Sequence, residues 1–402
     1  MFDAFSKSIL LENPNKKIII YGTGVLGEIT FRALQKLNIQ PDLFCDHDPN
    51  ETIYQGIRVI SPTRLCNYRD DIIIVAFKDY IQEALRNLDT AGCNYRYNIS
   101  ELLKVEGIDE NLSPRAKELL SGKIDYSVIL KVAEMGEQII MQHCEIFITE
   151  RCTLRCKDCS ALIPYFLAPQ DIDFCEFESL NRLLDAVDMI SEVSVLGGEP
   201  LLHKNLSKIL TVLLKSNKVG KVALYTNGTI FPQRELMEVL KHPKVWVHIS
   251  EYNNSKQKTK ELEAILLNAG IQCYRRQYDF WIDAGNLHLR SKNSLRAGKL
   301  FSRCFKAKCY SFYKGKLYGC VRASNGVALG KIAEDDIEYV DFNIYRKKED
   351  LRNEIKQRLL SVPYFKSCYY CDGMISEGNR VFPAIQCNGQ KGEKETGETF
   401  ES

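Results

Sequence analysis

Short apolar runs separated by amphipathic stretches recur along the first hundred residues. Strand-like runs lie at 16–21, 42–45, 57–60 and 71–76, and all except 42–45 are rich in β-branched residues. The spacing of Phe31, Leu34 and Leu37 places them on one face of a predicted helix, and a second helix is expected at 80–88. Strands that alternate with helices favour a parallel, doubly wound α/β sheet. We therefore predict a Rossmann-like domain over residues 1–110.

The same alternation returns in the second half of the chain. From Cys144 to about Leu289, strand-like runs are followed by helical patterns such as 176–190 and 206–214. This repetition predicts a second α/β domain at 141–298, whose strands are again parallel.

Three other segments complete the predicted organisation. Residues 111–140 are expected to form a helical linker, in which Ser113-Pro114 has the character of a helix start. Residues 299–390 are expected to form a small cysteine-rich extension. The tail at 391–402 is rich in Gly, Glu, Lys and Thr and lacks apolar periodicity, which predicts disorder.

Composition and charge narrow the function classes. The chain has 402 residues, 45% of them hydrophobic and 26% charged, which is typical of a soluble globular protein. A formal net charge of +2 gives no support for binding to nucleic acid or to an acidic membrane. The sequence contains no apolar run of about 18 residues and no signal pattern at 1–17. A cytoplasmic protein without membrane or nucleic-acid partners is therefore expected.

Three closely spaced cysteines are the first candidate site. Cys152, Cys156 and Cys159 are separated by three and by two residues, and they follow a strand-like run at 146–148. Thiolates this close together can wrap an iron–sulfur cluster or a zinc ion. Both groups usually take four ligands, and only three are local here. In a [4Fe–4S] cluster the fourth iron would then be open to an exogenous ligand, whereas a plain zinc or structural site is the alternative.

This spacing resembles the motif of the radical S-adenosylmethionine (SAM) enzymes, which are built on a partial (β/α)6 barrel. The resemblance implies a [4Fe–4S] cluster whose open iron binds SAM. Cleavage of SAM there yields a 5′-deoxyadenosyl radical that abstracts hydrogen from a substrate. Asp158 departs from the family pattern, since most members carry an aromatic residue at that position, beside the adenine. Tyr165 and Phe166 are nearby substitutes.

Three later stretches match family motifs in the expected order, each at the end of a strand-like run. The resemblance implies that they bind SAM, with Glu199 facing its amino group and Ser250 its ribose. The implied SAM-binding residues are Gly197, Gly198, Glu199, Pro200, Thr226, Asn227 and Ser250. Because barrel enzymes carry their sites at the carboxyl ends of the strands, these residues are expected to lie close to the three cysteines.

A second set of cysteines lies in the C-terminal extension: Cys304, Cys309, Cys320, Cys368 and Cys371. Gly315-x4-Cys320 followed by Cys368-x2-Cys371 resembles the SPASM/twitch extension, which implies one auxiliary [4Fe–4S] cluster. Five cysteines compete for four places, and either Cys304 or Cys309 completes the set. A zinc ribbon is the alternative. The remaining cysteines are expected to be small buried hydrophobes: Cys45, Cys66, Cys93, Cys144, Cys175, Cys273 and Cys387.

The N-terminal domain contains a glycine-rich turn between its first strand and helix. Gly22, Gly24 and Gly27 form G-x-G-x-x-G, and Asp46 and Asp48 end the next strand. Residues 14–105 resemble the N-terminal domain of bacterial nucleotide-sugar acyltransferases, which implies a UDP-sugar site at this turn. The alternative is a Rossmann-like fold that has lost its ligand.

Three functions compete for the whole chain. The first is a radical SAM enzyme that oxidises a carbohydrate or nucleotide-linked small molecule, with an auxiliary cluster as electron acceptor and a reductant such as flavodoxin or ferredoxin. The second is a maturase of a ribosomal peptide, and the third a non-enzymatic metal- or nucleotide-binding module. No catalytic base can be singled out. The candidates for the base are Glu251, Tyr252, Arg275, Arg276, Asp279 and Asp283, and Arg322 is a candidate contact to substrate phosphate or a cluster sulfide.

Overall fold

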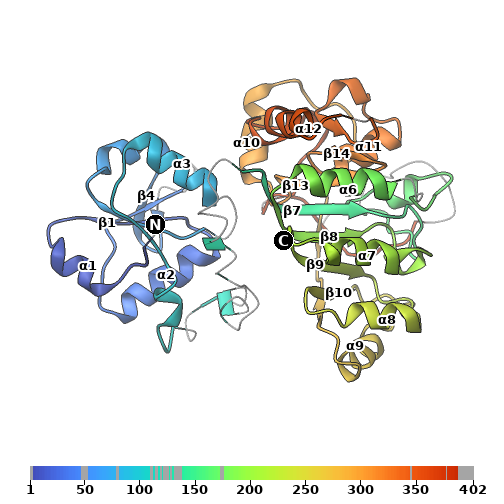
Figure 1. Ribbon diagram of the computed structural model, residues 1–402, viewed down its shortest axis with the longest axis horizontal. Helices are drawn as coiled ribbons and strands as arrows, with labels where there is room; N and C mark the ends of the chain where they lie inside the picture. Colours follow the sequence, from blue (N-terminus) through green and yellow to red (C-terminus); the bar gives the residue numbers. More distant parts are fainter. Residues whose placement is uncertain are drawn as a thin grey trace. The chain divides into compact units, whose positions relative to one another are not determined.

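The computed structural model divides the chain into two compact units, residues 1–138 and 139–402 (Figure 1). The described residues are 3–46, 53–77, 81–108, 138–172, 176–344, 346–376 and 378–387, with single positions between 112 and 130. Most of the predicted linker, the tail at 391–402, Tyr80, Asp48 and Cys175 lie outside these ranges. Each unit is described by itself.

The first unit is built on a six-stranded sheet. Its elements are α1 (Lys7–Glu12), β1 (Ile18–Tyr21), α2 (Val25–Lys36), β2 (Leu43–Cys45), β3 (Ile53–Tyr54), β4 (Ile57–Ile60), η1 (Pro62–Tyr68), β5 (Ile72–Val75), α3 (Ile81–Ala91), β6 (Arg96–Asn98) and η2 (Leu102–Lys104). The strand order is β3-β4-β2-β1-β5-β6, and every neighbouring pair is parallel except β3 with β4. Strands β1, β2 and β5 are buried throughout, as expected where both faces of a parallel sheet are covered. The predicted parallel α/β sheet is confirmed.

The second unit contains an eight-stranded sheet in the order β11-β10-β9-β8-β7-β13-β14-β15. Its first half comprises β7 (Ile140–Phe147), η5 (Ile163–Tyr165), α6 (Glu176–Ala186), β8 (Met189–Leu196), η6 (Pro200–Leu202), α7 (Leu206–Lys215), β9 (Val219–Thr226), α8 (Arg234–Leu240), β10 (Val245–Glu251), α9 (Thr259–Asn268) and β11 (Cys273–Gln277). These five strands are parallel, and a helix lies between each successive pair in the chain. This is the predicted α/β architecture, with every strand pointing its carboxyl end to the same edge.

The cysteine-rich segment continues the same sheet. It comprises β12 (Trp281–Ile282), α10 (Ser294–Arg303), β13 (Cys309–Tyr313), β14 (Lys316–Tyr318), α11 (Val321–Ala328), η7 (Glu334–Asp336), β15 (Tyr339–Asp341), α12 (Lys348–Ile355), η8 (Lys356–Leu360), η9 (Lys366–Tyr370) and β16 (Arg380–Val381). Strand β13 adds to β7 in parallel, and β14 and β15 follow antiparallel. The short strand β12 pairs with β16 in a separate two-stranded sheet. The predicted boundary at 298/299 therefore falls within one compact unit, and this finer division stays a prediction.

Alternation along the strands gives the second sheet two different faces. One face packs Ile146, Val193 and Leu224 against the helices in a large apolar core. The other face carries polar residues such as Glu145 and Glu192, because successive side chains in a strand point to opposite sides. No helix among the described residues is long and apolar enough to cross a bilayer.

Candidate functional site

The three-cysteine loop follows β7 and is held against the loop after β8. The backbone N–H of Gly198 donates to the Thr149 carbonyl at 2.8 Å, and that of Glu199 donates to the Arg151 carbonyl at 2.8 Å. A Cβ at Gly197 would lie 2.5 Å from the Thr149 oxygen, and one at Gly198 would lie 2.2 Å from the Arg151 oxygen. The two glycines therefore allow the loops to make contact directly before Cys152.

Glu199 joins the ends of β8 and β9. Its side chain is completely buried, and its carboxylate accepts hydrogen bonds from the Thr226 hydroxyl at 2.8 Å, the Asn227 N–H at 2.8 Å and the Leu201 N–H at 3.1 Å. Burial raises the pKa of this carboxyl to about 7, against the effect of the three donors. Thr226 and Asn227, two residues of the predicted SAM site, are thus hydrogen-bonded to a third, Glu199.

The ends of β9 and β10 are tied to the same edge. The Asn227 amide donates to the Cys152 sulfur at 3.6 Å and to the Thr153 hydroxyl at 3.1 Å. The Gln257 amide donates to the carbonyls of Asn227 at 2.6 Å and Ser250 at 2.7 Å. The structure therefore brings the predicted residues at all four strand ends together. Gln257 was missed by the sequence reasoning, because it lies in a polar loop without any motif.

A C-terminal segment lies along the cysteine loop. Backbone N–H groups of Lys157 and Cys387 donate to the carbonyls of Ile385 and Arg155, both at 2.7 Å. The Gln386 side chain accepts from the Arg155 N–H at 2.7 Å and donates to the Cys156 sulfur at 3.5 Å. Burial raises the pKa of Cys152 to about 11 and that of Cys156 to about 12. Without a metal these thiols are therefore protonated, and a bound cluster would have to displace their protons.

Aromatic side chains adjoin the three cysteines. Tyr252 and Trp281 pack against the cluster of Leu154, Cys156 and Ala384, with their own ring centroids 5.0 Å apart at 84°. Of the two substitutes for the missing family aromatic, Phe166 packs in an apolar cluster with Cys152 and Cys159. The Tyr165 hydroxyl donates to the Lys157 carbonyl at 3.0 Å. These rings give the loop an apolar setting.

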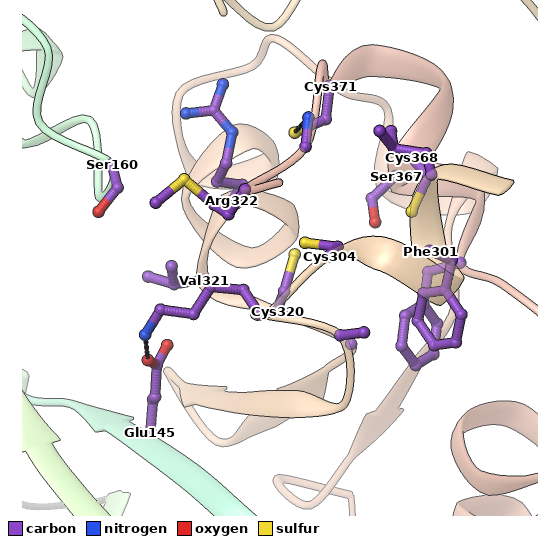
Figure 2. Close-up of a pocket in the computed structure, with 17 residues that line it drawn as sticks. Glu145, Ser160, Phe301, Cys304, Cys320, Val321, Arg322, Ser367, Cys368 and Cys371 are labelled. Atoms are coloured by element: carbon purple, nitrogen blue, oxygen red, sulfur yellow. Dashed lines mark hydrogen bonds and ion pairs between the residues drawn. The ribbon is translucent and has the colours of Figure 1, made fainter. Parts of the chain in front are cut away.

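Four cysteines of the C-terminal set line one cavity with a volume of about 50 Å³ (Figure 2). They are Cys304, Cys320, Cys368 and Cys371. Cys309 is not among the lining residues; it begins β13, and its sulfur contacts the Phe305 carbonyl at 3.9 Å. The structure therefore favours Cys304 over Cys309 as the fourth member. Among the described residues no three His, Cys, Asp or Glu side chains close around a single ion.

The thiols of this cavity suit a cofactor that can ionise them. Burial raises the pKa of Cys320 to about 12, and the nearby Cys371 and Cys304 raise it further. Burial raises the pKa of Cys304 and Cys368 as well, and each of these thiols also feels its neighbours. Bound iron would stabilise Cys304, Cys320 and Cys368 as thiolates against these effects.

The remaining wall of the cavity is mostly apolar but carries two buried polar atoms without a partner. Nε of Arg322 and Oε2 of Glu145 have no hydrogen-bond partner among the described residues, and both side chains line the cavity. The other oxygen of Glu145 accepts from the Lys306 ammonium at 2.6 Å, and this carboxylate raises the pKa of Lys306. An unsatisfied N–H donor beside four thiols fits a cluster, because cluster sulfides and thiolates accept hydrogen bonds. Ser160, the residue after Cys159, also lines this cavity.

The candidate bases suggested by the sequence lie away from the cavity of the four cysteines, and Tyr252 alone among them packs beside Cys156. Glu251 accepts from the Thr259 hydroxyl at 2.9 Å and pairs with Arg275, and these partners lower its pKa despite burial. Arg275 also binds Glu263 at 2.7 Å, and Arg276 lies over the Tyr278 ring at 4.8 Å. Asp279 and Asp283 accept hydrogen bonds from residues two positions away in the chain. None of these candidates lines the cavity with the four cysteines.

The three glycines of the turn in the first unit differ in the space that a Cβ atom would have. Gly22 has φ +122°, and a Cβ there would lie 2.6 Å from the Ala76 oxygen. A Cβ at Gly27 would lie 2.0 Å from the Gly22 oxygen, whereas nothing lies within 4 Å of a Cβ at Gly24. The Asp46 carboxylate accepts from the N–H and hydroxyl of Thr23, at 2.6 and 2.7 Å. Asp46 therefore braces the turn, and Gly24 alone borders open space.

Two family models match separate parts of the chain. The radical SAM superfamily matches residues 146–250, and the family described as C2185-like, N-terminal, matches residues 14–99. Among curated proteins, GTP 3′,8-cyclase of Clostridium acetobutylicum is 32% identical over 94 residues, 23% of this chain and 29% of the relative. The same enzyme of Stenotrophomonas maltophilia is 34% identical over 89 residues, which are 22% of this chain and 27% of that relative. The matched region thus spans under a third of these relatives.

Solved structures with a similar arrangement include BtrN in complex with AdoMet and 2-DOIA. It is 16% identical, with 57% of this chain and 92% of that chain covered and a TM-score of 0.37. The anSMEcpe structure with bound AdoMet is 12% identical, with 58% of this chain and 82% of that chain covered and a TM-score of 0.38. SuiB of Streptococcus suis is 17% identical, with 50% and 44% covered and a TM-score of 0.28. At these TM-scores the structures inform neither the substrate nor the reaction.

Proposed function

Because residues 146–250 match the radical SAM superfamily, we propose that this protein oxidises a carbohydrate or a nucleotide-linked small molecule by hydrogen abstraction. Cys152, Cys156 and Cys159 would hold the SAM-binding [4Fe–4S] cluster, and Glu199 and Ser250 would contact SAM. When bound, that cluster supplies the electron that cleaves SAM to methionine and the 5′-deoxyadenosyl radical.

One observation supports the oxidative type. The four C-terminal cysteines share their cavity with Ser160, and Val321 packs in one apolar cluster with Cys152 and Cys159. A second redox centre at these cysteines would therefore adjoin the SAM site. In the proposed reaction the carbinol C–H hydrogen goes to the 5′-deoxyadenosyl radical, the hydroxyl proton to a base or water, and the remaining electron to the auxiliary [4Fe–4S] cluster. The products are a carbonyl compound and 5′-deoxyadenosine.

The test uses the full chain with both clusters reconstituted without oxygen. SAM and dithionite are added with a panel of sugars, sugar phosphates and nucleotide sugars, each deuterated at its carbinol carbons. A substrate should transfer deuterium to 5′-deoxyadenosine and yield a product two hydrogens lighter. Deuterium transfer without that product would refute the oxidation, and turnover of a peptide alone would favour the maturase function.

The burial of Glu199 predicts a pH-dependent affinity for SAM. Its folded pKa of about 7 lies above the value of an exposed glutamate, so protonation of Glu199 stabilises the fold at low pH and this contribution is lost as the pH rises through 7. The SAM ammonium favours the ionised carboxylate, so SAM affinity should rise up to about pH 7 and level off above it. Equilibrium dialysis from pH 6 to 9 measures this dependence.

Glu199→Gln should weaken SAM binding about tenfold at pH 8 and flatten the pH profile, because an amide neither ionises nor attracts an ammonium as strongly. Glu251→Gln is the matched control, since that carboxylate pairs with Arg275. An unchanged SAM affinity in Glu199→Gln would exclude Glu199 from the binding site.

We also propose that the first unit holds a nucleotide sugar at its glycine-rich turn. Gly24→Ala should leave the thermal stability of the full chain within about 0.5 kcal/mol but abolish this binding, because its Cβ would enter the open space before α2. Gly27→Ala should instead destabilise the unit by more than about 3 kcal/mol, because its Cβ would overlap the Gly22 carbonyl. Titration calorimetry of the full chain with UDP-sugars and dinucleotides measures the binding, and scanning calorimetry measures the stability. If no member of that panel binds, the unit is a scaffold and not a nucleotide-sugar site.

A further inference from the structure

Arg322 is a buried positive charge without an acidic partner in the described part of the chain. It is 6% exposed, one of its terminal nitrogens donates to the Gly285 carbonyl, and Nε has no acceptor. No ion pair to Arg322 is formed by the described residues. An uncompensated guanidinium in the interior is strongly unfavourable. The fold therefore leaves a place for negative charge that comes from outside the polypeptide.

The position of Arg322 indicates where this negative charge belongs. Arg322 lies in the first turn of α11, whose N-cap is Cys320, and it lines the cavity with all four C-terminal cysteines and Ser160 (Figure 2). Backbone N–H groups of Arg322 and Ala323 also point to the Cys320 thiol. Two separate sources of positive potential therefore meet at the C-terminal cysteines.

The start of α11 also lies beside the first set of cysteines. Val321 and Arg322 line the same cavity as Ser160, which directly follows Cys159 in the chain. Val321 also packs in the apolar cluster against which Cys152 and Cys159 lie. The first two residues of α11 thus adjoin both sets.

We propose that Arg322 is the counter-charge shared by the two cluster sites and that it raises the reduction potential of both, the auxiliary site more strongly. This rests on the proposed function, which places a [4Fe–4S] cluster at each set. A thiolate-bound cluster is anionic and gains one further negative charge on one-electron reduction, so a fixed cation beside it stabilises the reduced state. A hydrogen bond from Nε to a cluster sulfide or thiolate acts in the same direction.

The test compares midpoint potentials in the reconstituted full-length protein. Samples are titrated anaerobically with dithionite and followed by electron paramagnetic resonance (EPR), which resolves the signals of the two clusters. Arg322→Gln should make reduction of the auxiliary cluster at least tenfold less favourable. This corresponds to a midpoint potential lower by at least about 59 mV for one electron. Arg322→Lys, which keeps the charge, should recover most of this shift. Arg182→Gln is the control, because Arg182 donates to the carbonyls of Phe342 and Asn343 and does not line the cavity.

Each outcome decides the proposal. Equal midpoints in wild type and Arg322→Gln, or an equal shift in Arg182→Gln, would overturn it. If Arg322→Gln fails to retain the auxiliary cluster, the first cluster of that same variant is titrated. A lowered midpoint there supports the shared charge, and an unchanged one contradicts it. A wild-type protein with only one EPR-active cluster would refute the auxiliary site of the proposed function, whereas the effect of Arg322 on the remaining cluster could still be measured.

Discussion

Protein in which Cys152, Cys156 and Cys159 are all replaced by alanine is expected to form no 5′-deoxyadenosine from SAM and dithionite. The three thiols lie on one loop after β7, where Asn227 and Gln386 donate hydrogen bonds to two of them. Without them no cluster can present an open iron to SAM. Iron and sulfide analysis with Mössbauer spectra should show a fall from about two [4Fe–4S] clusters per chain to about one.

Cys273→Ala is the matched control for this loss. Cys273 begins β11, its sulfur contacts the Glu263 carbonyl at 3.9 Å, and it does not line the cavity of the four C-terminal cysteines. This variant should keep both clusters and full SAM cleavage. SAM cleavage that survives the triple replacement would contradict the assignment of the first site.

Cys304→Ala is expected to lose the auxiliary cluster and the oxidised product, whereas Cys309→Ala should keep both. Cys304 faces the cavity with the other three thiols, and Cys309 begins the strand that pairs with β7. With the electron acceptor absent, hydrogen abstraction should continue but product should fall at least a hundredfold, because the substrate radical has no one-electron oxidant at hand. Deuterium transfer to 5′-deoxyadenosine and product formation are measured separately in each variant.

The opposite pattern, with Cys309 essential and Cys304 dispensable, would contradict the cavity as the cluster site. Zinc without iron at Cys320, Cys368 and Cys371 in wild-type protein would replace the auxiliary cluster by the zinc-ribbon alternative. Iron and zinc content of the purified protein distinguishes these cases before any kinetic measurement.

The sequence predicted the ends of the strands better than the contacts made across them. Cys152, Glu199, Asn227 and Ser250 each follow a recognisable apolar run, and parallel strands bring their carboxyl ends to one edge. Local patterns were therefore sufficient to place them together. Gly197 and Gly198 were predicted to bind SAM, and the structure adds a cause within the chain: both face carbonyls of the residues before Cys152.

Other features depend on pairings that no local pattern encodes. Strand β13 joins β7 although more than 160 residues separate Cys309 from His143, and this pairing decides which of two neighbouring cysteines reaches the cavity. Glu145 stands in the interior of β7, where its burial against Lys306 depends on that same addition. A charged residue within an apolar strand was the one available signal, and it did not reveal the partner.

The segment that lies along the cysteine loop is synthesised long after the loop itself. Gln386 binds the Arg155 backbone across a separation of 231 residues. At about 5–20 residues per second, the ribosome needs about 10–50 s to produce this segment after it has made the loop. For that interval the nascent thiols lack the C-terminal segment that lies along them in the finished fold. Loading of iron and sulfide is therefore best timed after the chain has left the ribosome, and a cell that makes this protein in air must protect the loop until then.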